Sequence, residues 1–197
     1  DLLIIQTKDG NINGKYTSFY GNGDVYYYQY FTNGKQDGKF EVFYPNKTLM
    51  KKGEYKDDEY DGEISYYYEN GAKRSIENYS NKKQNGIQTE WYADGKIKCE
   101  YNTQAGAYVG SYKYYYNNGV LSDSILYDTK GALLEKYNFD KNGVLLNKYT
   151  YKKDIPNTES HFDKSGKLIS TEKKNGKDYS IAIFGENHQK SEVKRCN

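Results

Sequence analysis

The spacing of glycine and tyrosine constrains this chain more than any other feature. Five glycines stand 24 residues apart, each followed six positions later by a tyrosine, in the pairs Gly14/Tyr20, Gly38/Tyr44, Gly62/Tyr68, Gly86/Tyr92 and Gly110/Tyr116. A further glycine follows nine positions after the first in four copies, as Gly23, Gly71, Gly95 and Gly119; in the remaining copy Lys47 takes its place. Self-similarity at a fixed period of this length is typical of repeat proteins.

Each copy has the pattern of a β-hairpin. The residues between the two glycines are mainly aromatic or β-branched, and most copies end in Asn-Gly or Asp-Gly, which supply the positive φ of a tight turn. A second, weaker apolar segment follows each turn. The sequence therefore predicts an all-β fold: an elongated, twisted antiparallel sheet of tandem β-hairpin repeats in a single solenoid-like layer.

The hairpin pattern divides the chain into four parts. We expect residues 1–13 to form a capping strand at the open edge of the sheet and residues 14–127 to hold five 24-residue repeats. Residues 128–176 are expected to form shorter 12-residue hairpins with an irregular loop near 152–159, and residues 177–197 a terminal strand and a polar tail. The shorter period is indicated by glycines 12 residues apart, Gly119, Gly131 and Gly143. The associated Asp-x-x-Gly sequences are typical of type I turns; they begin at Asp128, Asp140 and Asp163.

Alternation of side chains along the strands assigns two faces to the five repeats. Positions two, four and six after each leading glycine share the expected core face, which carries Tyr16, Ser18, Tyr20; Phe40, Val42, Tyr44; Ile64, Tyr66, Tyr68; Gln88, Glu90, Tyr92; and Tyr112, Tyr114, Tyr116. Polar Gln88 and Glu90 conflict with that assignment. The opposite face is mainly polar, with a recurring aromatic five positions after the glycine. We expect this aromatic ladder to be the binding surface, although packing on neighbouring side chains is the alternative; it consists of Phe19, Phe43, Tyr67, Trp91 and Tyr115.

Composition limits the partners. With 29 basic and 27 acidic residues the net charge is +2, which argues against a nucleic-acid-binding surface. No apolar run approaches the roughly 20 residues of a membrane span, so membrane contact is open but an integral protein is not expected. Two cysteines, Cys99 and Cys196, give no disulfide framework, and whether they pair stays open.

The sequence offers no catalytic or metal constellation. The two histidines, His161 and His188, are not near a cysteine or a serine motif, so we expect no enzyme activity and no cofactor. An acidic cluster around Asp57 and Asp58 lacks the alternating ligand spacing of a calcium loop, which favours a solvated turn and no metal site.

The pattern Gly-x-x-x-x-Tyr-Tyr-x-Asn-Gly, present at 62–71 and varied at 86–95 and 110–119, resembles the bacterial variant of the MORN repeat, often described as an antitoxin-type repeat. The resemblance covers 14 to about 127 well and continues loosely to about 170. It implies a twisted antiparallel sheet of hairpins, with family roles in protein interaction, membrane-lipid contact and toxin neutralisation. Lys47, Gln88 and Glu90 depart from the pattern, as does the change of period after Gly119.

These observations favour a non-catalytic β-repeat scaffold that binds a protein or glycan partner through an aromatic-lined face of its sheet. The chain begins at Asp1 rather than at methionine, and whether a signal peptide preceded it stays open. A secreted or cell-envelope protein of a bacterium is expected, with a cytoplasmic protein as the alternative. The competing hypotheses are an immunity or antitoxin protein that sequesters a toxin, and peripheral contact with membrane lipids. The identity of the partner and the oligomeric state stay open.

Overall fold

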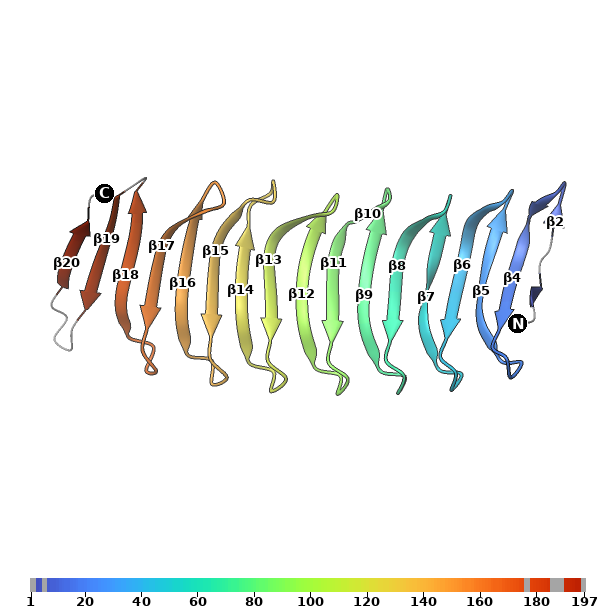
Figure 1. Ribbon diagram of the computed structural model, residues 1–197, viewed down its shortest axis with the longest axis horizontal. Coiled ribbons are helices and arrows are strands. Elements are labelled where there is room, and N and C mark those ends of the chain that lie inside the picture. Colours follow the sequence, from blue (N-terminus) through green and yellow to red (C-terminus); the bar gives the residue numbers. More distant parts are fainter. Residues whose placement is uncertain (1–2, 5–6, 176–177, 185–189, 196–197) are drawn as a thin grey trace. The chain divides into compact units, whose positions relative to one another are not determined.

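The computed structural model describes residues 3–4, 7–175, 178–184 and 190–195, and among these it contains strands and turns but no helix. The all-β fold of consecutive antiparallel hairpins is thereby confirmed (Figure 1). The chain divides into two compact units. The first comprises residues 1–97 and 103–106, and the second residues 98–102 and 107–197. The boundary lies inside β12 (Ile97–Gln104).

The first unit is built from hairpins that share one sheet. Its main strands are β4 (Gly14–Phe19), β5 (Val25–Thr32), β6 (Lys35–Phe43), β7 (Leu49–Lys56), β8 (Glu59–Tyr67), β9 (Lys73–Ser80), β10 (Lys83–Gln84) and β11 (Gly86–Trp91). Each pairs antiparallel with its neighbour from β4 to β9, and β10 and β11 both pair with β9. Near the start, β1 (Leu3–Ile4) pairs with β4, and β2 (Thr7–Lys8) pairs with β3 (Asn11–Ile12) in a separate ribbon. β1 thus lies beside β4. A capping role for residues 1–13 stays a prediction.

The second unit continues the same construction. After β12 its strands are β13 (Ala107–Tyr115), β14 (Leu121–Tyr127), β15 (Leu133–Phe139), β16 (Leu145–Lys152), β17 (Ile155–Phe162), β18 (Leu168–Asn175), β19 (Asp178–Phe184) and β20 (Lys190–Arg195). From β13 onward each strand pairs antiparallel with the next. The segment expected to be a polar tail therefore contributes a strand, β20.

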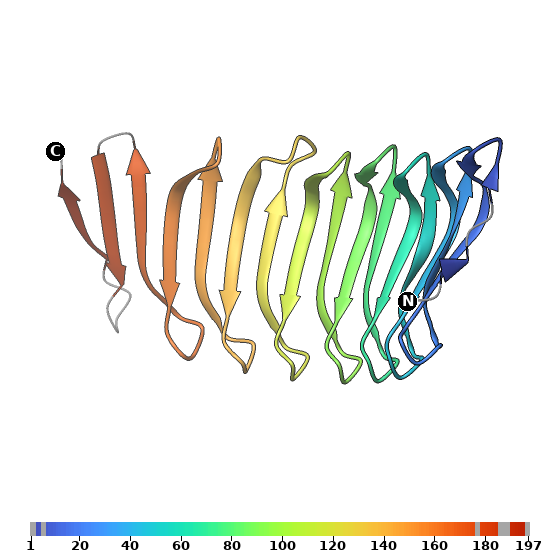
Figure 2. The ribbon, with the colours of Figure 1, turned by 45° about the vertical axis from the view of Figure 1, so that its right-hand side comes forward.

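Two kinds of turn join the strands, and in the first unit they lie at opposite edges (Figure 2). In the first kind, five residues close the hairpin. The Tyr20 N–H donates to the Asp24 carbonyl at 2.7 Å, and the Gly23 N–H donates to the Tyr20 carbonyl at 2.9 Å. In the second kind, two residues with positive φ join the strands, as at Asp57 (50°) and Asp58 (68°). The second geometry is that of a type I′ turn, whose twist matches that of the strands.

The structure keeps the 24-residue step in the second unit. The turns at 116–120 and 140–144 join β13 to β14 and β15 to β16, so they lie at the same edge. Gly131 belongs to the turn at 128–132, which joins β14 to β15 at the opposite edge. The strands between them are seven or eight residues long. The 12-residue spacing of glycines expected over 128–176 thus arises because five-residue turns occur at both edges. It does not indicate shorter hairpins.

The irregular loop expected near 152–159 is not present. β16 continues to Lys152 and β17 begins at Ile155, so only Lys153 and Asp154, with φ of 53° and 61°, form the turn. Pro156 fits in a strand because the register shifts between Thr150 and Tyr151, and bulges are among the places where a sheet tolerates proline.

At one edge a tyrosine hydroxyl links each of several hairpins to the next. The tyrosine that opens the five-residue turn donates from its hydroxyl to a carbonyl 23 residues later. The bonds join Tyr20 to Phe43 (2.7 Å), Tyr44 to Tyr67 (2.9 Å), Tyr68 to Trp91 (2.8 Å) and Tyr116 to Phe139 (2.8 Å). These half-buried tyrosines lie beyond the strand ends, so alternation along the strand does not assign them to a face. A register shift between the fourth and fifth positions after the leading glycine, as between Tyr66 and Tyr67, ends the regular alternation of side chains along the strand.

At the other edge, backbone groups make the equivalent link. The second residue of a two-residue turn donates its N–H to the carbonyl 22 residues earlier, from Gly34 to Ile12, Asp58 to Gln36 and Gly106 to Gln84, each at 2.9 Å. The acidic cluster takes part in this edge, because Asp57 pairs with Lys35 at 2.9 Å and Asp58 accepts from the Gln36 N–H at 2.7 Å. Among the described residues, no group of histidine, cysteine or acidic side chains is arranged to hold a metal ion.

The packed core is thin. Among the described residues, the fully buried apolar side chains are Phe40, Ile64 and Cys99, which are 3%, 0% and 2% exposed. Phe40 and Ile64 stand two positions after their glycines, as the face assignment predicts. Cys99 is buried, and Cys196 lies outside the described residues, so whether the two cysteines pair stays open. A sheet with so few buried apolar residues has at least one face without a second layer.

Gln88 occupies the same core position in its repeat and is 1% exposed. Its amide oxygen accepts from the Asn78 N–H at 2.7 Å, and its amide nitrogen donates to the Asn78 carbonyl (3.2 Å) and the Gly86 carbonyl (3.1 Å). The side chain therefore bonds to backbone groups where the chain passes irregularly from β10 to β11. The polar residue is buried because its hydrogen bonds are satisfied, so it does not contradict the face assignment.

We predict that Lys47→Gly stabilises the protein. Lys47 has φ +69° at the place where Gly71 has +85°, and a left-handed conformation costs an L-residue roughly 1–2 kcal/mol. The exposed ion pair of Lys47 with Asp24 offsets little of this cost. We expect urea denaturation to show an increase of about 1 kcal/mol in the free energy of unfolding. The matched change Gly71→Lys should lower it by a similar amount, and equal stabilities for both variants would contradict the argument.

A second prediction concerns the tyrosine hydroxyls. Tyr68→Phe removes the bond to the Trp91 carbonyl while keeping the ring, and should lower the free energy of unfolding by about 1 kcal/mol. Tyr67→Phe is the control, because its hydroxyl makes no hydrogen bond among the described residues, and it should change stability by less than about 0.5 kcal/mol. Equal effects at the two positions would show that the hydroxyl link contributes nothing specific.

Candidate functional site

The aromatic ladder predicted from the sequence lies at strand ends. Its five members are the last residues of β4, β6, β8, β11 and β13, and all are half-buried. Within the first unit the rings contact the intervening return strands: Phe43 lies 6.3 Å from Tyr28, and the Lys52 ammonium lies 6.0 Å from the Tyr67 ring. No ring contact joins Phe19, Phe43, Tyr67 and Trp91 to one another in the described part of this unit. The ladder is regular in sequence without being a continuous aromatic surface, and its role in binding stays a prediction.

The opposite face of the first unit carries a denser set of rings. We call it the tyrosine face; it comprises Tyr16, Tyr27, Phe40, Tyr55, Tyr60, Tyr66 and Tyr79. The strand register places these side chains together, because Gly38 pairs with Tyr55, Tyr55 with Tyr60, and Gly62 with Tyr79. Residues directly opposite each other in an antiparallel pair share a face. Sequence reasoning missed Tyr60 here, because the repeat was counted from Gly62, whereas β8 begins three residues earlier at Glu59.

The rings of this face form two groups. In the first, Tyr16 stacks on Tyr27 with centroids 5.6 Å apart. In the second, Phe40 lies 4.7 Å from Tyr55 and 5.8 Å from Tyr60, and Tyr60 lies 5.3 Å from Tyr79. Aromatic pairs at such distances contribute about 0.5–1.5 kcal/mol each beyond the area that they bury. The rings are thereby held in place by one another instead of by a second layer.

A lysine lies among the rings of the second group. The Lys51 ammonium is 4.4 Å from the Tyr60 ring centroid, 4.7 Å from that of Tyr66 and 5.5 Å from that of Phe40. It also donates a hydrogen bond to the Tyr60 hydroxyl. Cation–π attraction therefore fixes the ammonium over an aromatic surface. Lys51 makes no ion pair among the described residues, so its charge is available to an anionic ligand.

A glycine allows the second group to pack. Gly53 pairs with Phe40, and a Cβ atom at Gly53 would lie 2.3 Å from the Ile64 Cδ1 and 3.1 Å from the Phe40 Cε1. Its φ is not in the left-handed region, so space rather than backbone conformation requires glycine here. The absence of a side chain at Gly53 lets Ile64 and Phe40 meet beneath the tyrosine rings.

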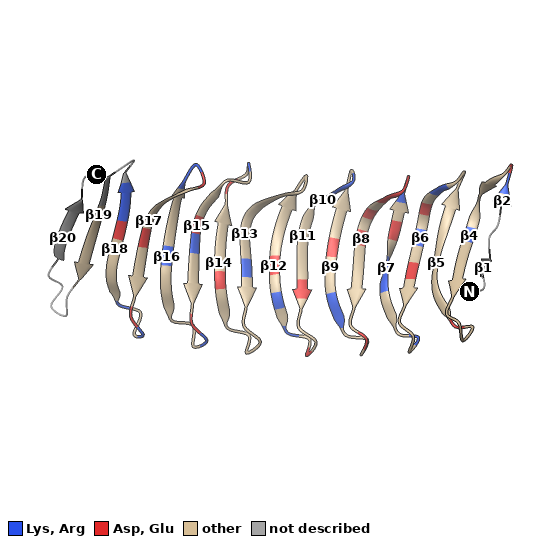
Figure 3. Ribbon diagram, viewed as in Figure 1, with Lys and Arg blue, Asp and Glu red and all other residues tan. Residues whose placement is uncertain are grey.

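Between the two groups lies a hollow of about 270 Å³. Its lining residues are Tyr26, Tyr27, Gln29, Gln36, Phe40, Val42, Lys51 and Tyr55. The Gln36 amide nitrogen donates to the Gln29 amide oxygen at 2.8 Å. The lining contains one basic and no acidic side chain, and β5, on one side of it, carries no charged residue (Figure 3). The hollow combines aromatic rings, amides and one ammonium.

Burial raises the pKa of the tyrosines on this face. The pKa of Tyr79 is raised to about 12, first by burial and then by its hydrogen bond to Glu77. The pKa of Tyr27 is also raised to about 12, by burial and then by a hydrogen bond with Tyr16. Burial likewise raises the pKa values of Tyr55 and Tyr66. All four phenols are neutral hydrogen-bonding groups at ordinary pH.

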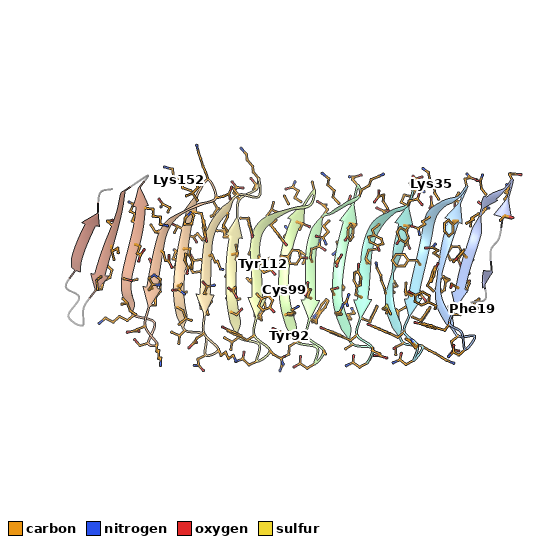
Figure 4. All side chains as sticks on the ribbon, viewed as in Figure 1. Phe19, Lys35, Tyr92, Cys99, Tyr112 and Lys152 are labelled. Atoms are coloured by element: carbon orange, nitrogen blue, oxygen red, sulfur yellow. The ribbon has the colours of Figure 1, made fainter. Side chains whose placement is uncertain are left out.

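The second unit has a smaller ring cluster and a more polar face. Tyr101 stacks on Tyr112 with centroids 5.2 Å apart, and Tyr108 stacks on Tyr127 at 5.4 Å. Figure 4 shows Tyr112 in the middle of its strand, whereas Phe19 and Tyr92 lie near the edge formed by the five-residue turns. His161, the histidine considered for catalysis, lies 2.8 Å from Asn147 and 3.4 Å from Glu159.

The aspartates of the Asp-x-x-Gly turns cap their own turns. Asp128 accepts from the Lys130 N–H (2.7 Å) and the Ala132 N–H (2.9 Å), and Asp140 and Asp163 make the corresponding bonds. These bonds to backbone N–H groups lower the pKa of Asp128. Local turn geometry therefore accounts for the three carboxylates without a ligand.

Some of these hairpins are similar to a repeat of a known protein family. A family model described as "MORN repeat variant" matches residues 36–57, 60–81, 84–105 and 108–129. The first two segments correspond to the hairpins β6–β7 and β8–β9. Four tandem segments of the chain are therefore similar to the MORN repeat variant. The hairpin β4–β5, counted from the sequence as the first of five repeats, is not among the matched segments.

Other comparisons add little. A chain from the "GtfA/B complex bound to UDP and GlcNAc" is similar at 16% identity and a TM-score of 0.37, covering 49% of this chain and 22% of that chain. A likeness at this level gives no information about a ligand for this chain. No curated protein matches the sequence. Among the described residues there is no helix long and apolar enough to span a membrane.

We predict that alkaline pH destabilises the tyrosine face. The folded pKa of Tyr27 and Tyr79, about 12, lies above the value of about 10 in an unfolded chain. Their contribution to stability is therefore complete below about pH 10 and is lost as the pH rises from about 10 to 12. Urea denaturation should show a lower midpoint at about pH 11.5 than at about pH 9.

Ultraviolet absorbance of tyrosinate provides the direct measurement. Wild-type protein should show a group of tyrosines that titrates near pH 12, and Tyr79→Phe should reduce the amplitude of that group. If all tyrosines titrate together near pH 10 in the folded protein, the burial of this face is contradicted.

Proposed function

We propose that this protein is a non-catalytic binding scaffold and that its ligand, a protein or a glycan, contacts the tyrosine face of the first unit. The observation that carries the proposal is a set of aromatic rings that are ordered by mutual contact but have no second layer over them among the described residues. Ring-to-ring distances of 4.7–5.8 Å keep Tyr55, Tyr60 and Phe40 in position before a ligand arrives. Little side-chain entropy is then lost on binding.

The chemistry of the face supports binding over catalysis. Tyrosine offers a large, rigid contact surface with a polar end, and such residues dominate the energetics of many interfaces. Val25 and Tyr26 are 36% and 39% exposed at the margin of the face. The tandem MORN repeat variants support a scaffold because each repeat adds a hairpin without adding a convergent polar site.

Two tyrosines on one strand provide a matched test. Tyr26 and Tyr30 both lie on β5 and are 39% and 40% exposed, but Tyr26 lines the hollow whereas Tyr30 pairs with Lys15 on the opposite face. The wild-type chain is immobilised and exposed to an extract of its source cells. Retained proteins are measured by mass spectrometry and retained carbohydrate by monosaccharide analysis. Tyr26→Ala should weaken binding of the retained ligand by about tenfold, and Tyr30→Ala by less than about twofold.

The aromatic ladder is tested in the same experiment. Trp91→Ala removes the largest ring of the ladder and should leave binding within about twofold of wild type if the tyrosine face is the contact surface. Loss of binding in Trp91→Ala together with wild-type binding in Tyr26→Ala would overturn the proposal and assign the ladder as the binding surface. Circular dichroism and urea denaturation of each variant identify any loss that results from unfolding.

A further inference from the structure

The hollow beside Val42 arises from one departure from the repeat. Position four after the leading glycine holds Ser18, Val42, Tyr66, Glu90 and Tyr114 in the successive copies. In the third copy, Tyr66 lies over the Lys51 ammonium, whereas Val42, which pairs with Lys51 from the other side, is too short to cover it. The space left is the hollow of about 270 Å³. Because Val42 is shorter than Tyr66 in the next repeat, a space remains open on one side of Lys51.

The groups around the hollow define the chemistry of what fits there. The lining includes Tyr26 and Tyr27 from β5, Phe40 from β6 and Tyr55 from β7, together with the amides of Gln29 and Gln36. One bond joins the two amides, so each retains further donor or acceptor capacity. Aromatic rings contact the C–H face of a sugar, while amides bond to neighbouring hydroxyls. A ligand that presents both a C–H face and hydroxyls satisfies all these groups together.

Lys51 adds a requirement for negative charge. It is the only charged side chain that lines the hollow, it makes no ion pair among the described residues, and its ammonium is held by the rings of Tyr60 and Tyr66. An ammonium has three donors, and the bond to the Tyr60 hydroxyl uses one. A carboxylate at the edge of the hollow would accept the others. A single ammonium is too little for an anionic membrane surface, which attracts clusters of about four to eight basic residues.

We propose that the hollow binds one acidic sugar residue of an anionic polysaccharide, with the sugar ring between the aromatic walls and its carboxylate on Lys51. This inference rests on the proposed function and names the ligand class for part of the tyrosine face. A hexuronic acid residue combines the C–H face, the hydroxyls and the carboxylate in one ring. An acidic peptide presents the carboxylate but lacks the array of hydroxyls that the amides of Gln29 and Gln36 would bind.

Isothermal titration with defined probes tests the inference. The probes are tetragalacturonate, the uncharged cellotetraose and a hexaglutamate peptide. Tetragalacturonate should bind wild-type protein at least about fivefold more tightly than either of the other two. Lys51→Gln should remove about fivefold of that affinity, whereas Lys39→Gln, which removes an exposed lysine from the opposite face of the same unit, should leave it unchanged.

Val42→Tyr is the sharper variant, because it fills the hollow with the residue that the next repeat carries at this position and leaves the rings, the two amides and the ammonium of the lining in place. It should weaken tetragalacturonate binding by about tenfold or more while leaving the urea midpoint close to wild type. Unchanged binding in Val42→Tyr would overturn the inference. Preference for hexaglutamate with the same dependence on Lys51, or no binding of tetragalacturonate, would overturn it as well.

These outcomes are distinguishable from failure of the proposed function. If tetragalacturonate does not bind but Tyr26→Ala still loses the ligand retained from cell extract, the sugar assignment is wrong and the tyrosine face remains the binding surface. If tetragalacturonate binds with the expected dependence on Lys51 and Val42, while Tyr26→Ala retains the cellular ligand, the sugar site stands and the main partner binds elsewhere.

Discussion

A hydrogen bond from a tyrosine hydroxyl to a carbonyl of the next hairpin is the contact on which the register of the first unit depends. Strand pairing alone joins each strand only to its two neighbours. The bonds from Tyr20, Tyr44 and Tyr68 reach across a return strand to the end of the following hairpin, and the N–H groups of Gly34 and Asp58 make the corresponding links at the other edge. Where both links are present, a hairpin is tied to its neighbours at both edges. A sheet that buries few apolar side chains gains order from these repeated polar links.

The small number of buried apolar residues also explains why aromatic rings, and not aliphatic side chains, fill the tyrosine face. Phe40 and Ile64 are fully buried beneath the tyrosines, and Gly53 is the position that lets them meet. Above them Tyr55 and Tyr60 remain half-exposed, because nothing in the described chain covers that side. A partly wet aromatic surface is both the upper part of a thin core and a surface suited to ligand contact. The rings of the tyrosine face therefore contribute both to the stability of this unit and to its proposed binding surface.

Variation within the repeat creates the individual features of an otherwise uniform sheet. Val42, at a position where the next repeat carries Tyr66, leaves a hollow, and Gln88 in place of an apolar residue bonds to the backbone where β10 gives way to β11. Lys47 in place of glycine keeps the turn but in an unfavourable conformation. Departures from the consensus are thus more informative about function than the consensus, because the consensus residues maintain the hairpin itself.

The sequence by itself determined the strand-turn rhythm, the glycine positions with positive φ and the burial of Phe40 and Ile64, since these depend on local backbone geometry and on alternation along a strand. It also indicated the turns at Asp128, Asp140 and Asp163, although their 12-residue spacing suggested shorter hairpins than the structure has. Only the tertiary structure decided that Tyr68 lies in a turn, that Tyr60 joins Tyr55 and Lys51, and that the aromatic ladder contacts the return strands. The reason is that bulges and the register of weakly patterned return strands depend on contacts with neighbouring strands, which no local pattern encodes.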